Sequence, residues 1–206
     1  ACGLIGLKPS RGLMPTGPLA GEGWGGLTTD HVVSRSVRDC ARALDATAGA
    51  DAGAPYAAPV LPASCEAALA EAPRGLRIGV VNRFFEGDAV HPEVAAVIDA
   101  FAGQLQALGH HVETAGFDFS THDVVYPVMQ GVATGTALFL DQLQQQRGRP
   151  ITRDEIEPVV WSAWETASRF KATDYLAAVN TFHRLGRQLA QFHERFDLLL
   201  TPTLAE

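Results

Sequence analysis

The sequence predicts an α/β fold, and two observations carry that prediction. Residues 76–81 have the pattern of a strand, an apolar helical face then recurs over 94–108, and residues 111–115 return as a short strand. A strand, a helix and a strand in this order imply a right-handed crossover between parallel strands. The apolar run at 197–201 follows a long helical pattern and is typical of a strand buried on both faces.

The first fifty residues predict a strand, a loop and a helix. Glycine alternates with leucine and isoleucine over residues 3–7, which favours a buried strand closely approached by neighbouring backbone, and a proline ends it. Glycines and prolines over 9–29 predict a long irregular loop of the kind that often borders a site. A helical pattern then begins at Ser36, which is suited to capping it, and Gly49 stops the helix.

The middle of the chain predicts a connector. Prolines and alanines over 50–74 disfavour a helix and favour an extended path along the surface. We therefore expect one partial domain over 1–206, organised into the following parts: a strand, loop and helix over 1–49, the connector over 50–74, the strand–helix–strand unit over 75–119, and a helical stretch with a closing strand over 120–206.

The last third of the chain is predicted to be mostly helical. A helix is expected over 122–146, and a capping box at Thr152–Glu155 precedes a further helix that begins near Pro158. A last helix is expected from about Thr173 to Phe196, with its aromatic and aliphatic side chains on one buried face.

Composition excludes several classes of function. The net charge is −7, and the two lysines and fourteen arginines are dispersed, so nucleic acid is not expected as a partner. No apolar run approaches the roughly 20 residues that cross a bilayer, which predicts a soluble, cytoplasmic protein without membrane contact. Cys2, Cys40 and Cys65 have neither disulfide nor zinc spacing, so we expect neither a disulfide framework nor a zinc site.

Four groups of residues could be interpreted as catalytic or ligand-binding, but a structural role explains each of them better. The seven histidines lack a Gly-x-Ser-x-Gly elbow that would present a serine to them. Glu155 and Glu157 suit a helix N-terminus better than glycoside chemistry. Trp161 and Trp164 are three residues apart on one helical face and fit a core better than a stacking platform. Lys8 is expected to be structural.

Three phrases of the sequence, in order, carry a resemblance. They are Gly3–Arg11 (GLIGLKPSR), Ser34–Asp39 (SRSVRD) before a helix that ends LDATAG, and Phe196–Thr203 (FDLLLTPT). In this order they resemble the amidase signature family of hydrolases. The phrases at 24–31 and 51–56 look more like the branch that includes 6-aminohexanoate cyclic-dimer hydrolases than the branch that feeds glutamine to aminoacylated tRNA.

This resemblance implies a fold, a chemistry and a site. The fold is an α/β/α layered arrangement, a mixed sheet with helices on both faces. The chemistry is hydrolysis of a carboxamide C–N bond in a small molecule through an acyl-serine intermediate, with no metal or organic cofactor. A neutral lysine and a second serine activate the nucleophile. The family's Gly-Gly-Ser-rich catalytic segment comes before the position of Ala1, so no catalytic residue is expected within these 206 residues, and we expect the chain alone to be inactive.

By the same resemblance, the acyl-binding cleft is bordered by the strand that ends in Thr-Pro and by the helix after the strand–helix–strand unit. The candidate substrate-binding residues are Met129, Ala133, Thr136, Thr201, Pro202 and Thr203. Ordinary packing is the competing explanation for each of them. A homo-oligomer is a further possibility, and two rival functions stay open: a non-catalytic binding or scaffolding module, and a subunit of a tRNA-linked amidotransferase.

Overall fold

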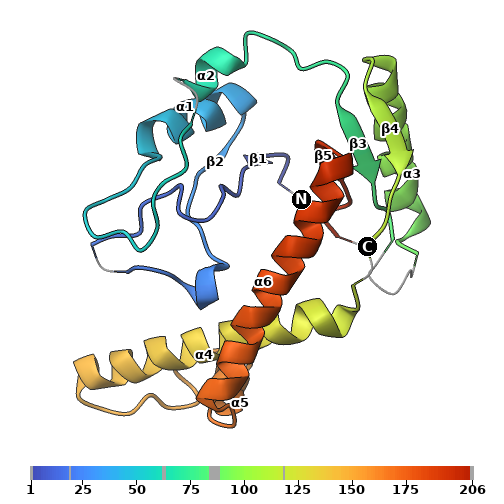
Figure 1. Ribbon diagram of the computed structural model, residues 1–206. Helices are drawn as coiled ribbons and strands as arrows, with labels where there is room; N and C mark the ends of the chain where they lie inside the picture. The colour runs from blue at the N-terminus through green and yellow to red at the C-terminus, as the bar shows by residue number, and fades with distance from the viewer. Residues whose placement is uncertain (1, 19, 62–63, 84–88, 118, 205–206) are drawn as a thin grey trace. The chain divides into compact units, whose positions relative to one another are not determined.

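The structure is a computed structural model that describes residues 2–18, 20–61, 64–83, 89–117 and 119–204 (Figure 1). The chain divides into two compact units, Ala1–Ala72 and Pro73–Glu206. The boundary falls near the end of the segment that the sequence predicts to be a connector. The fold class is α/β, as predicted, and each unit contains its own small sheet.

The sheet of the first unit is short and exposed. Strand β1 (Ile5–Gly6) pairs antiparallel with β2 (Val33–Ser34). The prediction of a buried strand at residues 3–7 is wrong, because Leu4, Ile5 and Leu7 are all more than a third exposed. Within the described part of this unit β1 pairs with β2 alone, so its side chains are not enclosed. A single 3-10 turn, η1 (Trp24–Gly26), interrupts the long irregular loop that the sequence predicts.

Two helices complete the first unit. Helix α1 (Val37–Thr47) begins as predicted at Ser36, whose side chain accepts a hydrogen bond from the Asp39 backbone N–H. Helix α2 (Cys65–Ala68) was not expected, because it lies inside the predicted connector. It forms because Asp45 of α1 accepts hydrogen bonds from the Cys65 and Glu66 backbone N–H groups, which satisfies donors that a short helix leaves open.

The second unit is built on a three-stranded parallel sheet. Strands β3 (Arg77–Val80) and β4 (His111–Thr114) pair parallel across helix α3 (Pro92–Ala107), which confirms the predicted strand–helix–strand unit. Strand β5 (Leu198–Leu200) pairs on the other side of β3, giving the order β4-β3-β5. The strand at 197–201 was predicted to be buried on both faces, but Leu198 is 48% exposed because β5 lies at an edge of this sheet.

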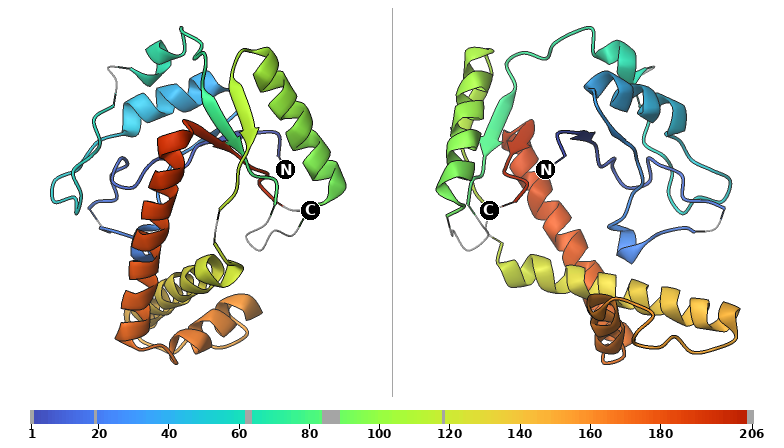
Figure 2. Two further views of the ribbon diagram at one scale, coloured as in Figure 1. Left: turned by 45° about the vertical axis from the view of Figure 1, so that its right-hand side comes forward. Right: turned by 180° about the vertical axis from the view of Figure 1, so that it is seen from behind.

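Helices cover both faces of this sheet. In Figures 1 and 2, α3 lies on one side of it and α6 (Ala172–Arg195) on the other. Gly79 in the middle of β3 shows how closely α6 approaches, because a Cβ placed there would lie 2.6 Å from the Phe192 ring. A side chain at this position would collide with the helix, so glycine is what allows α6 to lie against the strand.

The remaining helices pack on one another. Helix α4 (Thr121–Arg147) contacts both α6 and α5 (Pro158–Ala167). The buried face of α4 carries Pro127, Gln130, Ala133 and Leu140. The predicted capping box at Thr152 forms a turn rather than a helix start, since Glu155 accepts from the Thr152 N–H and α5 begins only at Pro158.

Candidate functional site

An apolar cavity of the second unit lies where its three parallel strands end. Val81 follows β3, Phe117 follows β4, and Thr201 follows β5, and all three side chains line a cavity of about 510 Å³. Helices α4 and α6 contribute Val124, Leu185 and Leu189. The carboxyl edge of a parallel sheet is where open α/β folds bind ligands, and a volume of this order suits a small organic molecule.

Backbone hydrogen bonds hold the sheet together up to the rim of this cavity. The Val81 N–H donates to the Leu200 carbonyl at 2.9 Å, and the Ala115 N–H donates to the Val80 carbonyl at 2.8 Å. Pro202 has no N–H to continue the ladder, so the chain leaves the sheet directly after Thr201. The turn at 201–203 therefore faces the cavity instead of extending the strand.

Aromatic rings form one wall of the cavity. Phe117 and Phe119 stack with centroids 5.1 Å apart and planes at 1°, and Phe117 also meets Phe192 of α6 at 4.9 Å. Phe119 is buried. Because both rings follow β4 directly and α6 fixes one of them, this wall is held by packing within the unit.

The lining of the cavity is predominantly apolar. Its polar groups are the hydroxyls of Thr201 and Thr203 and the guanidinium of Arg83. Such a surface favours the uncharged, carbon-rich part of a ligand and orients it with a few polar contacts. The arrangement can bind and orient a molecule, but the side chains of its described lining residues include no pair of a nucleophile and a base.

The predicted substrate-binding residues divide into two sets. Thr201, Pro202 and Thr203 line the cavity together. Met129, Ala133 and Thr136 do not, because Met129 points outward with 53% exposure, Ala133 is buried in the helix packing, and Thr136 is half-buried. The contribution of α4 to the cavity is Val124, closer to its start.

Several cavity residues were not expected from the sequence, and the clearest are the two phenylalanines after β4. The signal that could have found them is their Phe-x-Phe spacing directly after a parallel strand, which directs alternate side chains to one side. The others reach the cavity only through tertiary packing: Val81, Val90, Leu185, Leu189, Leu199 and Leu204.

The carboxylates with clearly shifted pKa values in the second unit serve structure. Hydrogen bonds from Arg77, first from its side chain and then from its backbone N–H, lower the pKa of Asp197 to about 2. Arg149, the Thr152 backbone N–H and Arg147 lower the pKa of Glu155 well below its usual range. Glu155 is thus held by two arginines in a turn that precedes α5, so its role is structural, but it does not lie in the first turn of a helix as the sequence predicted.

The other residues that the sequence singled out have local roles. Trp161 and Trp164 are half-buried and meet edge to face at 5.5 Å, and Trp164 donates a hydrogen bond to Asp141. Lys8 is exposed. The His110 ring accepts a hydrogen bond from the Leu76 backbone N–H at 3.3 Å, so it supports the start of β3.

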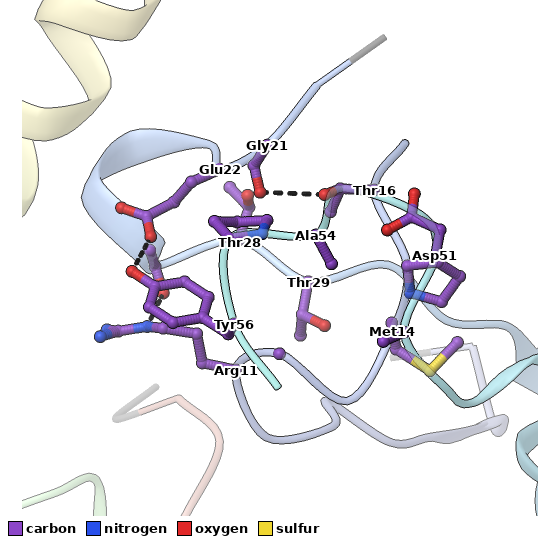
Figure 3. A pocket seen from close by; sticks show the side chains of 15 residues that line it. Arg11, Met14, Thr16, Gly21, Glu22, Thr28, Thr29, Asp51, Ala54 and Tyr56 are labelled. Atoms are coloured by element: carbon purple, nitrogen blue, oxygen red, sulfur yellow. Dashed lines mark hydrogen bonds between the residues drawn. The ribbon is translucent and has the colours of Figure 1, made fainter. Parts of the chain in front are cut away.

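A second pocket lies within the loops of the first unit and has a different character. It holds only about 30 Å³, roughly the space of one water molecule. Figure 3 shows hydrogen bonds among the lining residues. The Tyr56 hydroxyl donates to the Glu22 carboxylate, and the side chains of Arg11 and Thr16 donate to the backbone carbonyls of Gly26 at 2.8 Å and Gly21 at 2.9 Å. These bonds hold the loop, and the pocket is too small for an organic substrate.

The described part of the chain contains neither a group of side chains arranged for a metal ion nor a helix suited to span a membrane. Among residues with described positions, no group of three or more His, Cys, Asp or Glu side chains is arranged to hold a metal ion. A search of those same residues finds no helix with the length and apolar character needed to cross a bilayer.

This chain is similar to known amide hydrolases along its whole length. The Amidase family matches residues 1–206. Two 6-aminohexanoate-cyclic-dimer hydrolases are similar in sequence, at 30% identity over 208 residues in Pseudomonas sp. (strain NK87) and 32% over 212 residues in Paenarthrobacter ureafaciens. Each similarity covers 98% of this chain and 42% of the relative.

The fold is similar to that of solved structures as well. A structure of 6-aminohexanoate cyclic dimer hydrolase complexed with substrate matches with a TM-score of 0.89 at 29% identity, over 100% of this chain and 44% of that chain. The 206 residues therefore span less than half the length of the relatives they match.

Proposed function

The chain belongs to the Amidase family, as its sequence phrases predicted, and from this premise we propose that it forms part of a hydrolase that cleaves the carboxamide C–N bond of small molecules. Its likeness to the 6-aminohexanoate-cyclic-dimer hydrolases extends over 98% of the chain. One observation carries the structural side of the proposal: an apolar cavity of about 510 Å³ at the carboxyl ends of three parallel strands.

In this proposal the cavity receives the carbon chain of the acyl group. Apolar side chains from β5, α4 and α6 surround it, and burying a methylene of the substrate there contributes about 0.8 kcal/mol. The hydroxyls of Thr201 and Thr203 stand at the end of β5 and orient the polar end of the acyl chain by hydrogen bonding. Pro202 fixes the turn that presents them.

The second set of predicted residues has a more indirect role in the proposal. Met129 is exposed on the outer face of α4 and does not line this cavity, so a substrate contact at Met129 would lie outside the cavity. Thr136 lies two turns further along the helix and is half-buried. Ala133 is 5% exposed, and its small size serves the packing of α4 rather than substrate contact.

Bond cleavage in this proposal follows the family's route through an acyl-serine. A neutral lysine takes a proton through one serine from the hydroxyl of another, which attacks the amide carbonyl, and backbone N–H groups stabilise the oxyanion. The Gly-Gly-Ser-rich segment that carries this chemistry in the family has no counterpart in residues 1–206. We therefore assign these residues to substrate binding and expect the 206-residue chain to be inactive by itself.

The proposal is tested by filling the cavity in the gene product that contains these residues. Leu189→Trp places a large side chain in the cavity, so kcat/KM for amides of six-carbon acyl chains, including the cyclic dimer of 6-aminohexanoate, is expected to fall about a hundredfold, mainly through KM. The matched control is Leu176→Trp on the exposed face of the same helix, which is expected to leave activity unchanged. Equal activity of the two variants would show that the cavity does not bind the substrate.

The rival function, a non-catalytic binding module, gives a different result in the same preparation. Purified gene product would bind six-carbon amides, and Leu189→Trp would abolish that binding, but neither ammonia nor amine would be released. Hydrolysis by the 206-residue chain alone, if one substitution within it removed the activity, would contradict our assignment of these residues to binding.

A further inference from the structure

An ion pair joins two helices beside the cavity at the strand ends. A guanidinium nitrogen of Arg184 in α6 lies 3.1 Å from a carboxylate oxygen of Asp123 in the first turn of α4. The residue that follows each partner in the chain, Leu185 on α6 and Val124 on α4, lines the cavity. The pair therefore joins the two helices at the wall of the cavity.

The packing between these helices is interrupted next to the pair. Helices α4 and α6 cross and contact each other (Figure 1). A second pocket of about 230 Å³, which Asp123 lines, lies between them and shares no lining residue with the cavity at the strand ends. Asp123 and Val124 thus lie between two spaces, where side-chain packing alone does not fill the distance from α4 to α6.

The first turn of α4 is also less firmly tied to the rest of its own helix. Pro127 has no N–H to donate to the Asp123 carbonyl four residues earlier, so one helical hydrogen bond is missing there. Ser120 caps the turn, because its hydroxyl oxygen accepts the Asp123 backbone N–H at 3.0 Å. Ser120 fixes the turn to the segment before it, and Arg184 fixes it to α6.

The Asp123 carboxylate is oriented from two sides. One oxygen accepts a hydrogen bond from the Ser120 hydroxyl at 2.9 Å, and the other faces Arg184. Hydrogen bonds from Ser120, and to a smaller extent from Arg184, hold the pKa of Asp123 below its ordinary value, so the carboxylate is charged at neutral pH. The side chains of Arg184 and Asp123 are 49% and 40% exposed, so the pair adds little to the stability of the whole chain and its effect is local.

We propose that Arg184 is a positioning residue that sets the width of the acyl chain accepted by the cavity. Through Asp123 it holds the first turn of α4 against α6, which keeps Val124 in place as a side wall. Without the pair, we expect the turn to move away from α6 and the cavity to widen. This inference rests on the proposed function, in which the cavity receives the acyl group of an amide, and adds that the cavity selects unbranched acyl chains.

The test uses the gene product that contains these residues. It compares hexanamide with a series of dimethyl-branched hexanamides whose branch lies at successive carbons of the chain. Arg184→Gln keeps a polar side chain and removes the charge. We expect KM for hexanamide to rise about threefold with kcat unchanged. The kcat/KM of the best branched amide, divided by that of hexanamide, is expected to rise about fivefold.

Two further variants and a control separate positioning from folding. Arg184→Lys keeps the charge and should return most of the selectivity. Asp123→Asn removes the other charge but keeps a capping side chain, and combining it with Arg184→Gln should add no further change, because both act through one contact. The control is Arg195→Gln, since Arg195 pairs with Glu113 at 3.5 Å from the same helix and lies outside the cavity lining. It should leave KM and the selectivity unchanged.

The inference is overturned if Arg184→Gln has the same selectivity as Arg195→Gln, if Arg184→Lys does not restore it, or if the effects of Arg184→Gln and Asp123→Asn add. An equal loss of kcat/KM on every amide would assign Arg184 a purely structural role and overturn it as well. Each of these results leaves the proposed function intact if Leu189→Trp still lowers kcat/KM about a hundredfold. A gene product that releases neither ammonia nor amine from any amide would overturn both.

Discussion

The two units reach a defined structure by different means. In the first unit, long loops are fixed by side chains that bond to distant backbone, as Arg11 does to Gly26 and Asp45 to the start of α2. In the second unit, a parallel sheet and packed helices define the structure, and Ile78 at its centre is 2% exposed. The first arrangement leaves a pocket the size of a water molecule, whereas the second leaves a cavity large enough for a substrate.

This difference shows what each kind of structure is suited to. In a loop held by polar side chains, each hydrogen bond keeps two segments within a few ångströms of each other, so the pocket between the segments is small. A parallel sheet ends abruptly, and the helices that cover its faces do not close the edge where the strands stop. The substrate-sized space is therefore expected in the second unit, and its integrity depends on apolar packing rather than on individual hydrogen bonds.

The largest effect is expected from disturbing that packing at Gly79. A Cβ at this position would lie 2.6 Å from Phe192 and 3.1 Å from the Ala115 side chain, so Gly79→Val forces α6 away from β3. We expect a loss of about 1–3 kcal/mol in the free energy of unfolding, measured by urea denaturation with Trp161 and Trp164 reporting on this unit.

The control for Gly79→Val is a glycine with open space around it. Gly103 lies inside α3 and a Cβ there meets nothing within 4 Å, so Gly103→Ala is expected to stabilise the chain by about 0.5–1 kcal/mol. Adding Phe192→Leu to Gly79→Val should recover part of the loss. If Gly79→Val were as stable as Gly103→Ala, close contact between β3 and α6 would be the wrong explanation for this glycine.

The success of sequence-based prediction also differs between the units. The strand–helix–strand unit was predicted because its signals are local: a short apolar run at β3, and an apolar helical face with Pro92 at the start of α3. Helix α2 was missed because it has only four residues and depends on Asp45, which is twenty residues away in the chain. Its local signal is the capping residue Ser64, whose side chain accepts a hydrogen bond from the Ala67 backbone N–H, and Asp45 supplies the contacts that the local sequence does not show.

The same reasoning explains the errors in burial. Whether β5 is enclosed depends on its place at the sheet edge, and strand order is not contained in the sequence of one strand. On α4, the family resemblance implied that Met129 borders a cleft, whereas the packing of α5 and α6 buries the face with Gln130 and Ala133 and leaves Met129 53% exposed. Local periodicity predicts that a helix has an apolar face, and only the neighbours decide which face is buried.

The second largest effect is expected at Asp197, which joins the starts of β3 and β5. Arg77 lowers the pKa of this carboxyl to about 2, below the value of about 3.9 in an unfolded chain. Its contribution to stability is therefore fully present above about pH 4 and is lost as the pH falls toward 2. Asp197→Asn should lower the melting temperature at pH 7 and have a much smaller effect at pH 2, where about half of the natural carboxyl is itself protonated.

Glu113→Gln serves as the control for Asp197, because Glu113 pairs with Arg195 at 3.5 Å on a far more exposed part of the surface. Exposed ion pairs contribute little to the free energy of unfolding, so the melting temperature of Glu113→Gln should follow that of the unaltered chain at both pH values. A melting temperature of Asp197→Asn equal to that of the control at pH 7 would show that the Arg77 contact does not stabilise the sheet.

A smaller and local effect is expected at Asp45 in the first unit. The backbone N–H groups of Glu66 and Cys65 lower the pKa of its carboxyl to about 2, so the same pH window applies. Asp45→Asn should increase hydrogen exchange at residues 64–69 and leave β3 and β5 unchanged, because the carboxylate supports a four-residue helix rather than a sheet. Faster exchange throughout both units would contradict the local role assigned to Asp45.

The smallest effect is expected at the polar pocket of the first unit. Tyr56→Phe removes the hydroxyl that bonds to Glu22 but keeps the ring beside Gly12, where φ is +78° and an added Cβ would lie 3.0 Å from the Tyr56 Cβ. We expect a loss of at most about 1 kcal/mol, seen as a small shift in the urea midpoint followed by Trp24 fluorescence. Tyr56→Ala removes the ring as well and should cost clearly more. If the two variants were equally unstable, the hydrogen bond alone would hold this loop, and the first unit would depend on single polar contacts even more than the comparison of the two units suggests.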